Sequence, residues 1–168
     1  MVCALLVLTA CDSDPSGPKP VKTADAYIAA IRWYVASLPA PGPAGTDSTE
    51  SAEDAEPLVV FIAPSDGVLI DADAQVAVLA ELDDMSESVS VVFEDVRDDA
   101  IDLEAENQPV KDNGVLLLVG KVVEGPPPVE VAIEVYRHID DDESFQMRII
   151  RAGSDDYEVT AVTQLEQN

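Results

Sequence analysis

Basic residues are scarce in this chain. The 168 residues include 9 Lys and Arg against 34 Asp and Glu, which leaves a formal net charge of −25. Nucleic-acid binding needs a basic face that attracts phosphates, so we expect no nucleic-acid partner. The same charge argues against electrostatic docking onto anionic lipid headgroups. Hydrophobic residues make up 47% of the sequence, too many for a fully disordered acidic chain, so we expect one folded domain with tails.

Histidine and cysteine are scarcer still, with His138 as the only histidine and Cys3 and Cys11 as the only cysteines. Zinc sites are built mainly from these residue types, so we predict no metal and no cofactor. A nucleophile needs an adjacent base, and His138 is expected to lie exposed at the end of a strand. No Gly-x-Ser-x-Gly motif occurs either. We therefore predict no catalytic residues and a protein that is not an enzyme.

The uncharged apolar stretch 1–10 is too short to span a bilayer, which takes about 20 residues, but it suits the apolar part of a secretion signal. The residues Leu8-Thr9-Ala10-Cys11 that end it resemble the lipobox of bacterial lipoproteins. That resemblance implies cleavage before Cys11, acylation of this cysteine with chains such as palmitate, and anchoring on the extracytoplasmic face of the cell membrane. The alternative is an apolar N-terminal strand that happens to end in cysteine.

The resemblance also divides the chain. We expect a signal peptide at 1–10, a lipidated Cys11 with a disordered tether at 11–22, and a single domain at 23–168 that contains a disordered acidic, Pro-rich loop at 39–57. Lipoprotein signals open with Lys or Arg, and none precedes Cys11, so we expect the true start to lie upstream. The mature domain then has no thiol, which excludes a disulfide framework.

The first expected element of the domain is a helix. Thr23 is placed to cap it, Asp25 lies favourably in its first turn, and Pro39 ends it. Apolar residues recur there at helical spacing: Tyr27, Ile28, Ile31, Tyr34, Val35 and Leu38. Trp33 lies off this stripe, so it either packs under a loop or acts as a contact residue.

The middle of the domain predicts a strand–helix–strand unit. The run 58–63 is apolar and β-branched, Asp71 can cap a second helix, and 88–96 returns as a strand. This order allows a parallel strand pair. We predict that the helix turns these residues inward: Gln75, Val76, Val78, Leu79 and Leu82.

The C-terminal part alternates apolar and polar residues and predicts four strands in an antiparallel meander with one solvated face. The expected strands cover 115–123, 129–136, 145–150 and 157–165. We thus predict an α+β fold, in which an N-terminal helix packs on a curved, mainly antiparallel C-terminal sheet with the strand–helix–strand unit between them. The helix and the meander resemble cystatin-like and NTF2-like domains. The whole chain more loosely resembles uncharacterised actinobacterial lipoproteins, through its acidic tether and its late Tyr-x-Val-x-x-Val strand.

Two groups of residues are candidate sites. Alternation places Tyr136, Arg148 and Ile150 on the solvated sheet face, and we predict that they are protein contacts. Trp33 of the first helix is a fourth candidate contact. The alternative is that these are ordinary surface residues. An acidic turn is a candidate weak cation site, with a solvated turn as the alternative: Asp140, Asp141, Asp142 and Glu143.

These observations favour a lipid-anchored envelope protein with a non-catalytic binding or accessory domain, whose partners are the membrane and an envelope protein. The alternative is a small carboxylate-dependent hydrolase with a cleft between helix and sheet. The net negative charge itself is consistent with two roles: electrostatic attraction of basic partners, or adaptation of the protein to a salt-rich environment. The oligomeric state is open at this point.

Overall fold

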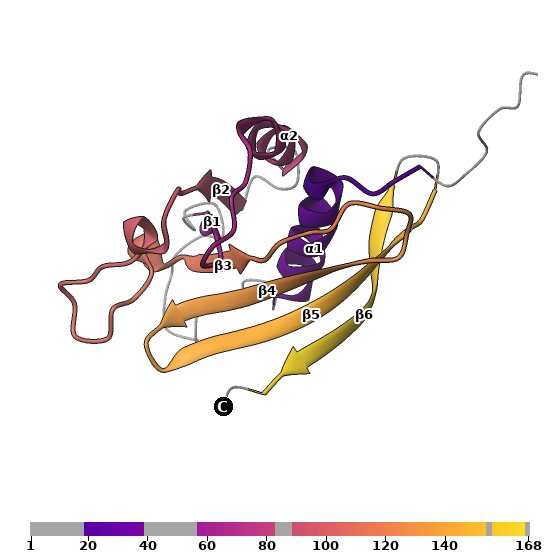
Figure 1. Ribbon diagram of the computed structural model, residues 1–168. Coiled ribbons are helices and arrows are strands. Elements are labelled where there is room, and N and C mark those ends of the chain that lie inside the picture. The colour runs from indigo at the N-terminus through magenta and orange to yellow at the C-terminus, as the bar shows by residue number, and fades with distance from the viewer. Residues whose placement is uncertain (1–18, 39–56, 83–88, 154–155, 167–168) are drawn as a thin grey trace, which may run out of the picture.

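The computed structural model describes residues 19–38, 57–82, 89–153 and 156–166. Figure 1 shows the two α-helices and the sheet that these residues form. The elements in chain order are α1 (Thr23–Ser37), β1 (Leu58–Pro64), α2 (Ala72–Leu82), β2 (Val89–Phe93), the 3₁₀ turns η1 (Arg97–Ala100) and η2 (Lys111–Asn113), β3 (Val115–Val119), β4 (Val129–His138), β5 (Asp141–Arg151) and β6 (Tyr157–Leu165).

The six strands form one sheet in the order β2-β1-β3-β4-β5-β6. β1 pairs in parallel with β2 and with β3, and the pairs from β3 to β6 are antiparallel. The predicted parallel pair and the predicted four-strand meander are therefore both confirmed. The fold is α+β, as the sequence pattern indicates.

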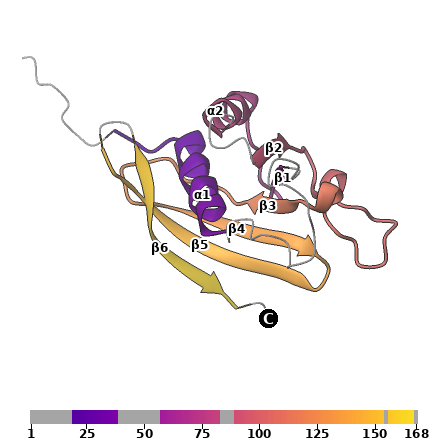
Figure 2. The same cartoon turned by 180° about the vertical axis from the view of Figure 1, so that it is seen from behind.

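Both helices lie on the same side of the sheet, which we call the inner face, and α1 runs across β4, β5 and β6 (Figure 2). Tyr27, Ile31 and Tyr34 of α1 are buried in the main core. They meet side chains that alternate along the strands, such as Ile133 of β4 and Met147 of β5. The predicted helical stripe is thus the core-facing side of α1.

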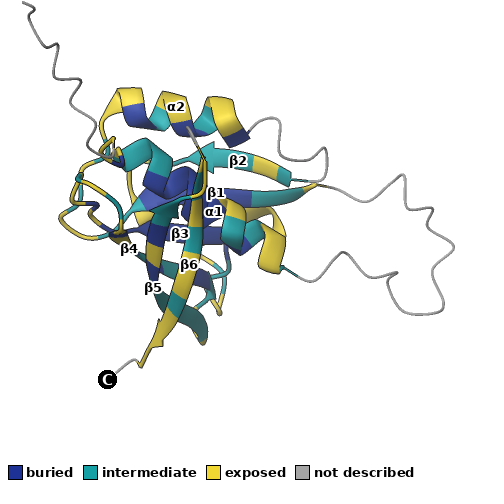
Figure 3. Cartoon of the chain, turned by 90° about the vertical axis from the view of Figure 1, so that its right-hand side faces the viewer, coloured by how far each residue is buried: buried dark blue, intermediate teal, exposed yellow. Residues whose placement is uncertain are grey.

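The opposite, outer face of the sheet is covered over only part of its width. A second, smaller core lies there, where residues 97–113 pack over β1 and β3 and bury Phe61 and Leu116. Every residue of β3 is buried, because this central strand is covered on both sides. In the described ranges, no segment packs over the outer face of β5 and β6 in this way, and much of β6 is exposed (Figure 3). The predicted solvated face therefore holds for the last strands but not for β3.

The start of the domain differs from the prediction. Val21, which the prediction assigns to a disordered tether, is fully buried and forms a β-bridge with Gly125. Thr23 does not cap α1, because its backbone N–H and its hydroxyl both donate to the Glu124 carboxylate, at 2.9 and 3.0 Å. Lys22 occupies the N-cap position instead. Contacts with residues about a hundred positions away in the chain thus hold Val21 and Thr23, and Val21 belongs to the packed domain rather than to a tether.

The helix α2 begins where the sequence predicts, but fewer of its residues face the core than predicted. The Asp71 carboxylate accepts a hydrogen bond from the Ala74 N–H at 2.8 Å and so caps the helix. Ala74, Val78 and Leu82 are buried, whereas Val76, predicted to point inward, is 67% exposed. The four-residue spacing of the buried side chains shows that α2 packs along a single line. The predicted signal peptide at 1–10, the predicted lipidated Cys11 with the tether as far as residue 18, and the loop predicted at 39–57, apart from Pro57, lie outside the described residues.

Candidate functional site

Tyr136 does not belong to the exposed outer face, so its prediction as a surface contact is wrong. It is only 2% exposed, because the segment 97–113 covers this end of β4. Its hydroxyl donates to the Gln108 carbonyl at 2.8 Å, and the Arg97 guanidinium lies 4.5 Å from the ring centroid. Alternation correctly assigns Tyr136 to the outer face, but it does not reveal what covers that face.

Arg148 and Ile150 do lie together on the uncovered outer face of β5. Arg148 is exposed, Ile150 is half-buried, and the register sets Arg148 between Glu130 of β4 and Ala161 of β6. Thr160 of β6 also reaches this area and donates its hydroxyl to the Arg148 carbonyl at 3.3 Å. A guanidinium and an aliphatic side chain on an open sheet surface can serve as protein contacts.

Trp33 lies on the other side of the sheet from this pair. It is half-buried and packs edge-on against Phe145 of β5, with 6.3 Å between the ring centroids. The sheet therefore separates Trp33 from Arg148 and Ile150, and the structure does not join the predicted contact residues into one surface.

The acidic residues 140–143 do not converge on a point. The turn between β4 and β5 comprises only 139–140, so Asp141, Asp142 and Glu143 belong to β5 and alternate between its faces. Asp141 and Glu143 instead approach the Arg137 guanidinium, at 3.2 and 3.7 Å. The four residues are therefore not arranged as the predicted cation site. In the part of the chain that the structure describes, no group of three or more His, Cys, Asp or Glu side chains is placed to hold a metal.

Arg137 is the centre of a polar cluster that the sequence analysis missed, which we call the Arg137 cluster: Tyr34, Arg137, Asp141 and Glu143. The Arg137 guanidinium also donates to the Tyr34 hydroxyl at 3.1 Å. Burial raises the pKa of Tyr34, and the nearby Arg137 charge opposes part of that rise. The cluster joins the last turn of α1 to the β4–β5 hairpin, so its evident effect is structural. Only the pattern Arg-x-x-x-Asp at 137–141 hinted at it.

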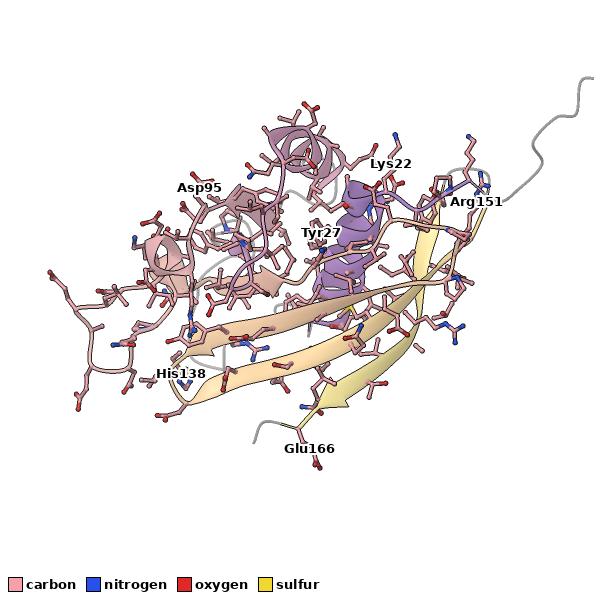
Figure 4. All side chains as sticks on the ribbon, viewed as in Figure 1. Lys22, Tyr27, Asp95, His138, Arg151 and Glu166 are labelled. Carbon is pink, nitrogen blue, oxygen red and sulfur yellow. The ribbon has the colours of Figure 1, made fainter. Side chains whose placement is uncertain are left out.

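The hairpin end of the sheet also carries His138 and a surface hollow. His138 is the last residue of β4, in agreement with its predicted place at a strand end, but it is only partly exposed (Figure 4). Its Nε2 lies 3.9 Å from an Asp141 oxygen. The hollow is lined by Asp142, Glu143, Ser144, Gln164, Leu165 and Glu166. Carboxylate and amide groups dominate this lining, and it lies at the surface rather than between helix and sheet.

Comparison with known proteins gives no relative: no family model matches the chain, and neither does any curated protein or solved structure. Among the described helices, none is long and apolar enough to cross a membrane.

Proposed function

We propose that this chain is a lipid-anchored protein of the bacterial cell envelope, whose domain binds another envelope protein on the extracytoplasmic side. The observation that carries the anchor is the sequence Leu8-Thr9-Ala10-Cys11 directly after an uncharged apolar stretch. Nine residues separate Cys11 from Val21, which is the first buried residue in the part of the chain that the structure describes. In extended form they would span about 28 Å, enough to hold the domain clear of the lipid headgroups.

The interior of the domain supports binding over catalysis. The space between α1 and the sheet is filled by apolar side chains, among them Ile31, Ile133 and Ile149. In the described ranges, no charged or polar residue falls in the buried class. A hydrolase built on two carboxylates would need a polar cleft at this place, so the apolar filling favours the binding proposal over that alternative.

The uncovered outer face around Arg148 and Ile150 is the surface that we propose for the partner. Interfaces combine a small apolar centre with polar groups that hold the register, and Arg is enriched among their strongest contacts. Arg148 is also one of few cations in an acidic chain, so it can select an acidic patch on the partner.

The anchor is tested by replacing Cys11 with Ala in the full chain and following it between membrane and soluble fractions. We expect Cys11→Ala to leave the membrane fraction or to remain unprocessed, because the acyl chains supply the attachment. Cys3→Ala is the matched control and should stay anchored at wild-type size. Membrane attachment that persists for Cys11→Ala at unchanged size would refute the proposal.

The binding surface is tested by crosslinking in cells, followed by identification of the captured protein. Arg148→Glu should abolish capture of a reproducible partner, whereas Lys121→Glu, an equal charge change at another exposed position, should leave it intact. If the wild type and Arg148→Glu capture the partner equally, the outer face around Arg148 is not the binding surface.

A further inference from the structure

We propose that β6 is a self-association edge, at which a second copy of this chain adds its own β6 in antiparallel orientation. This inference does not depend on the lipid anchor or on the outer-face partner. Among the strands that the structure describes, β6 is the last in the sheet, and β5 is the one strand it pairs with. Its other side therefore presents a row of backbone N–H and C=O groups over nine residues, and such an edge can accept another strand.

The charge distribution permits self-association along this edge. A chain with a net charge of −25 repels its own copies over most of its surface. Between Glu158 and Glu166, however, seven consecutive residues carry no charge, and none of them is proline. Natural edge strands are protected by charged side chains, Lys above all, by Pro or by a bulge, and β6 has neither Lys nor Pro but carries a bulge and Glu158 near one end.

The inner side of β6 is apolar but incompletely covered. The register places Val159 opposite buried Ile149 and Val162 opposite buried Met147, so both valines lie on the inner face. Tyr157 packs against the same core. All three side chains are only half-buried, because no strand follows β6 in the described part of the chain. A second copy would cover the exposed part of each.

The bulge in β6 selects one register for this pairing. No residue of β5 lies opposite Thr160 in the register, so the inner positions change from odd to even numbers along the strand: Tyr157, Val159, Val162 and Gln164. Two antiparallel copies must place inner residues against inner residues. Only one alignment does so along the whole strand, and it sets each Val159 against Val162 of the second copy.

The same alignment pairs the other positions between 157 and 164 without conflict. Tyr157 opposes Gln164, and on the outer face Glu158 opposes Thr163 of the second copy. No like charges face each other from Tyr157 to Gln164, and the two-fold axis repeats each contact twice. The geometry therefore points to a symmetric dimer with one continuous sheet of twelve strands.

The first test measures the mass of the full chain in nonionic detergent by sedimentation equilibrium. We expect a dimer, and we expect Thr163→Glu to weaken it by about tenfold or more, because two new pairs of like charges would form with Glu158. Thr163 is exposed, so this change spares the core. The double variant Thr163→Glu with Glu158→Lys should restore the dimer. A monomer at every concentration, or a dimer indifferent to Thr163→Glu, overturns the proposal.

The second test checks the register in the full chain after Cys3 and Cys11 have been changed to Ala. Adding Glu158→Cys together with Thr163→Cys should give a disulfide-linked dimer, because directly opposed positions lie within bonding distance. Glu158→Cys alone or Thr163→Cys alone should give no disulfide-linked dimer at this site, because each cysteine would then face Thr163 or Glu158 of the second copy rather than a cysteine. If the wild-type chain is a dimer and the double variant does not crosslink, this register is wrong and the proposed pairing fails.

Discussion

The Arg137 guanidinium donates a hydrogen bond to the Tyr34 hydroxyl across 3.1 Å, and this contact joins the end of β4 to the last turn of α1. The Tyr34 contact uses one terminal nitrogen of the guanidinium, and the carboxylates of Asp141 and Glu143 lie 3.2 and 3.7 Å from the other. The side chain of Arg137 is 36% exposed, so solvent screens part of this attraction.

Replacing Arg137 with Met should therefore lower the free energy of unfolding by about 1 kcal/mol, because the Tyr34 hydroxyl and two carboxylates lose their partner. Urea denaturation followed by circular dichroism measures the change. Arg148→Met is the matched control and should cost less than half as much, because Arg148 is exposed on the outer face. Equal losses in the two variants would show that the Arg137 cluster does not stabilise the fold.

Tyr27 should make the fold sensitive to alkali. Its hydroxyl donates to the Gly120 carbonyl at 2.9 Å, and burial, followed by the charge of Asp71, raises its pKa to about 12 from the ordinary value of 10.0. Between these values the unfolded chain releases the Tyr27 proton and the folded chain keeps it. The contribution of Tyr27 to the free energy of unfolding is therefore at its full value below pH 10. From pH 10 to 12 the free energy of unfolding falls by up to about 1.4 kcal/mol per pH unit.

Urea denaturation at a series of alkaline pH values measures this slope. Tyr27→Phe should be less stable than wild type at neutral pH, because the Gly120 carbonyl loses its donor, but it should show a flatter decline above pH 10. An unchanged slope in Tyr27→Phe would assign the alkaline sensitivity to other groups.

Gly114 should not tolerate a side chain. A Cβ at this position would lie 2.5 Å from the Val59 carbonyl oxygen and 3.2 Å from the Phe61 ring. A backbone carbonyl in a central strand cannot move aside, so Gly114→Ala should destabilise the protein by about 1–3 kcal/mol. Gly125→Ala, where a Cβ would meet no atom within 4 Å, serves as control in the same thermal unfolding experiment. Similar melting temperatures for the two variants would contradict the predicted clash.

Asp71 should contribute to stability through its cap of α2. Asp71→Ala removes the acceptor of the Ala74 N–H and should cost about 1 kcal/mol in urea denaturation. Asp71→Asn keeps a side-chain oxygen in place and should retain most of the stability. If both substitutions cost the same, the charge of Asp71 matters more than its hydrogen bond.

Local patterns predict the elements of this fold well, because each depends on residues close in the chain. The alternation in 129–136 yields β4 with Val131, Ile133 and Val135 buried, and the apolar spacing in α1 identifies its core side. The cap of α2 at Asp71 is equally local. The predictions are wrong where a distant segment makes an unforeseen contact. The Glu124 carboxylate accepts the hydrogen bond of the Thr23 N–H, so Thr23 does not cap α1, and residues 97–113 cover Tyr136.

The candidate sites depend even more on such distant contacts. A run of four acidic residues suggested a common cation site, yet the tight turn at 139–140 places three of them in a strand, where alternation separates Asp142 from Asp141 and Glu143. Arg137 then engages two of these carboxylates together with Tyr34, about a hundred residues earlier in the chain. No local pattern contains that combination.

The sequence by itself determined the charge of −25, the lipobox-like start, the order of helices and strands, and which side chains share a face, because these follow from composition and from periods of two and 3.6 residues. Only the tertiary structure decided which faces of the described sheet are covered, that Val21 belongs to the packed domain, and that β6 is the edge of the described sheet. Those outcomes depend on which distant segments come together, and the free energy of burying apolar surface determines that choice over the whole chain.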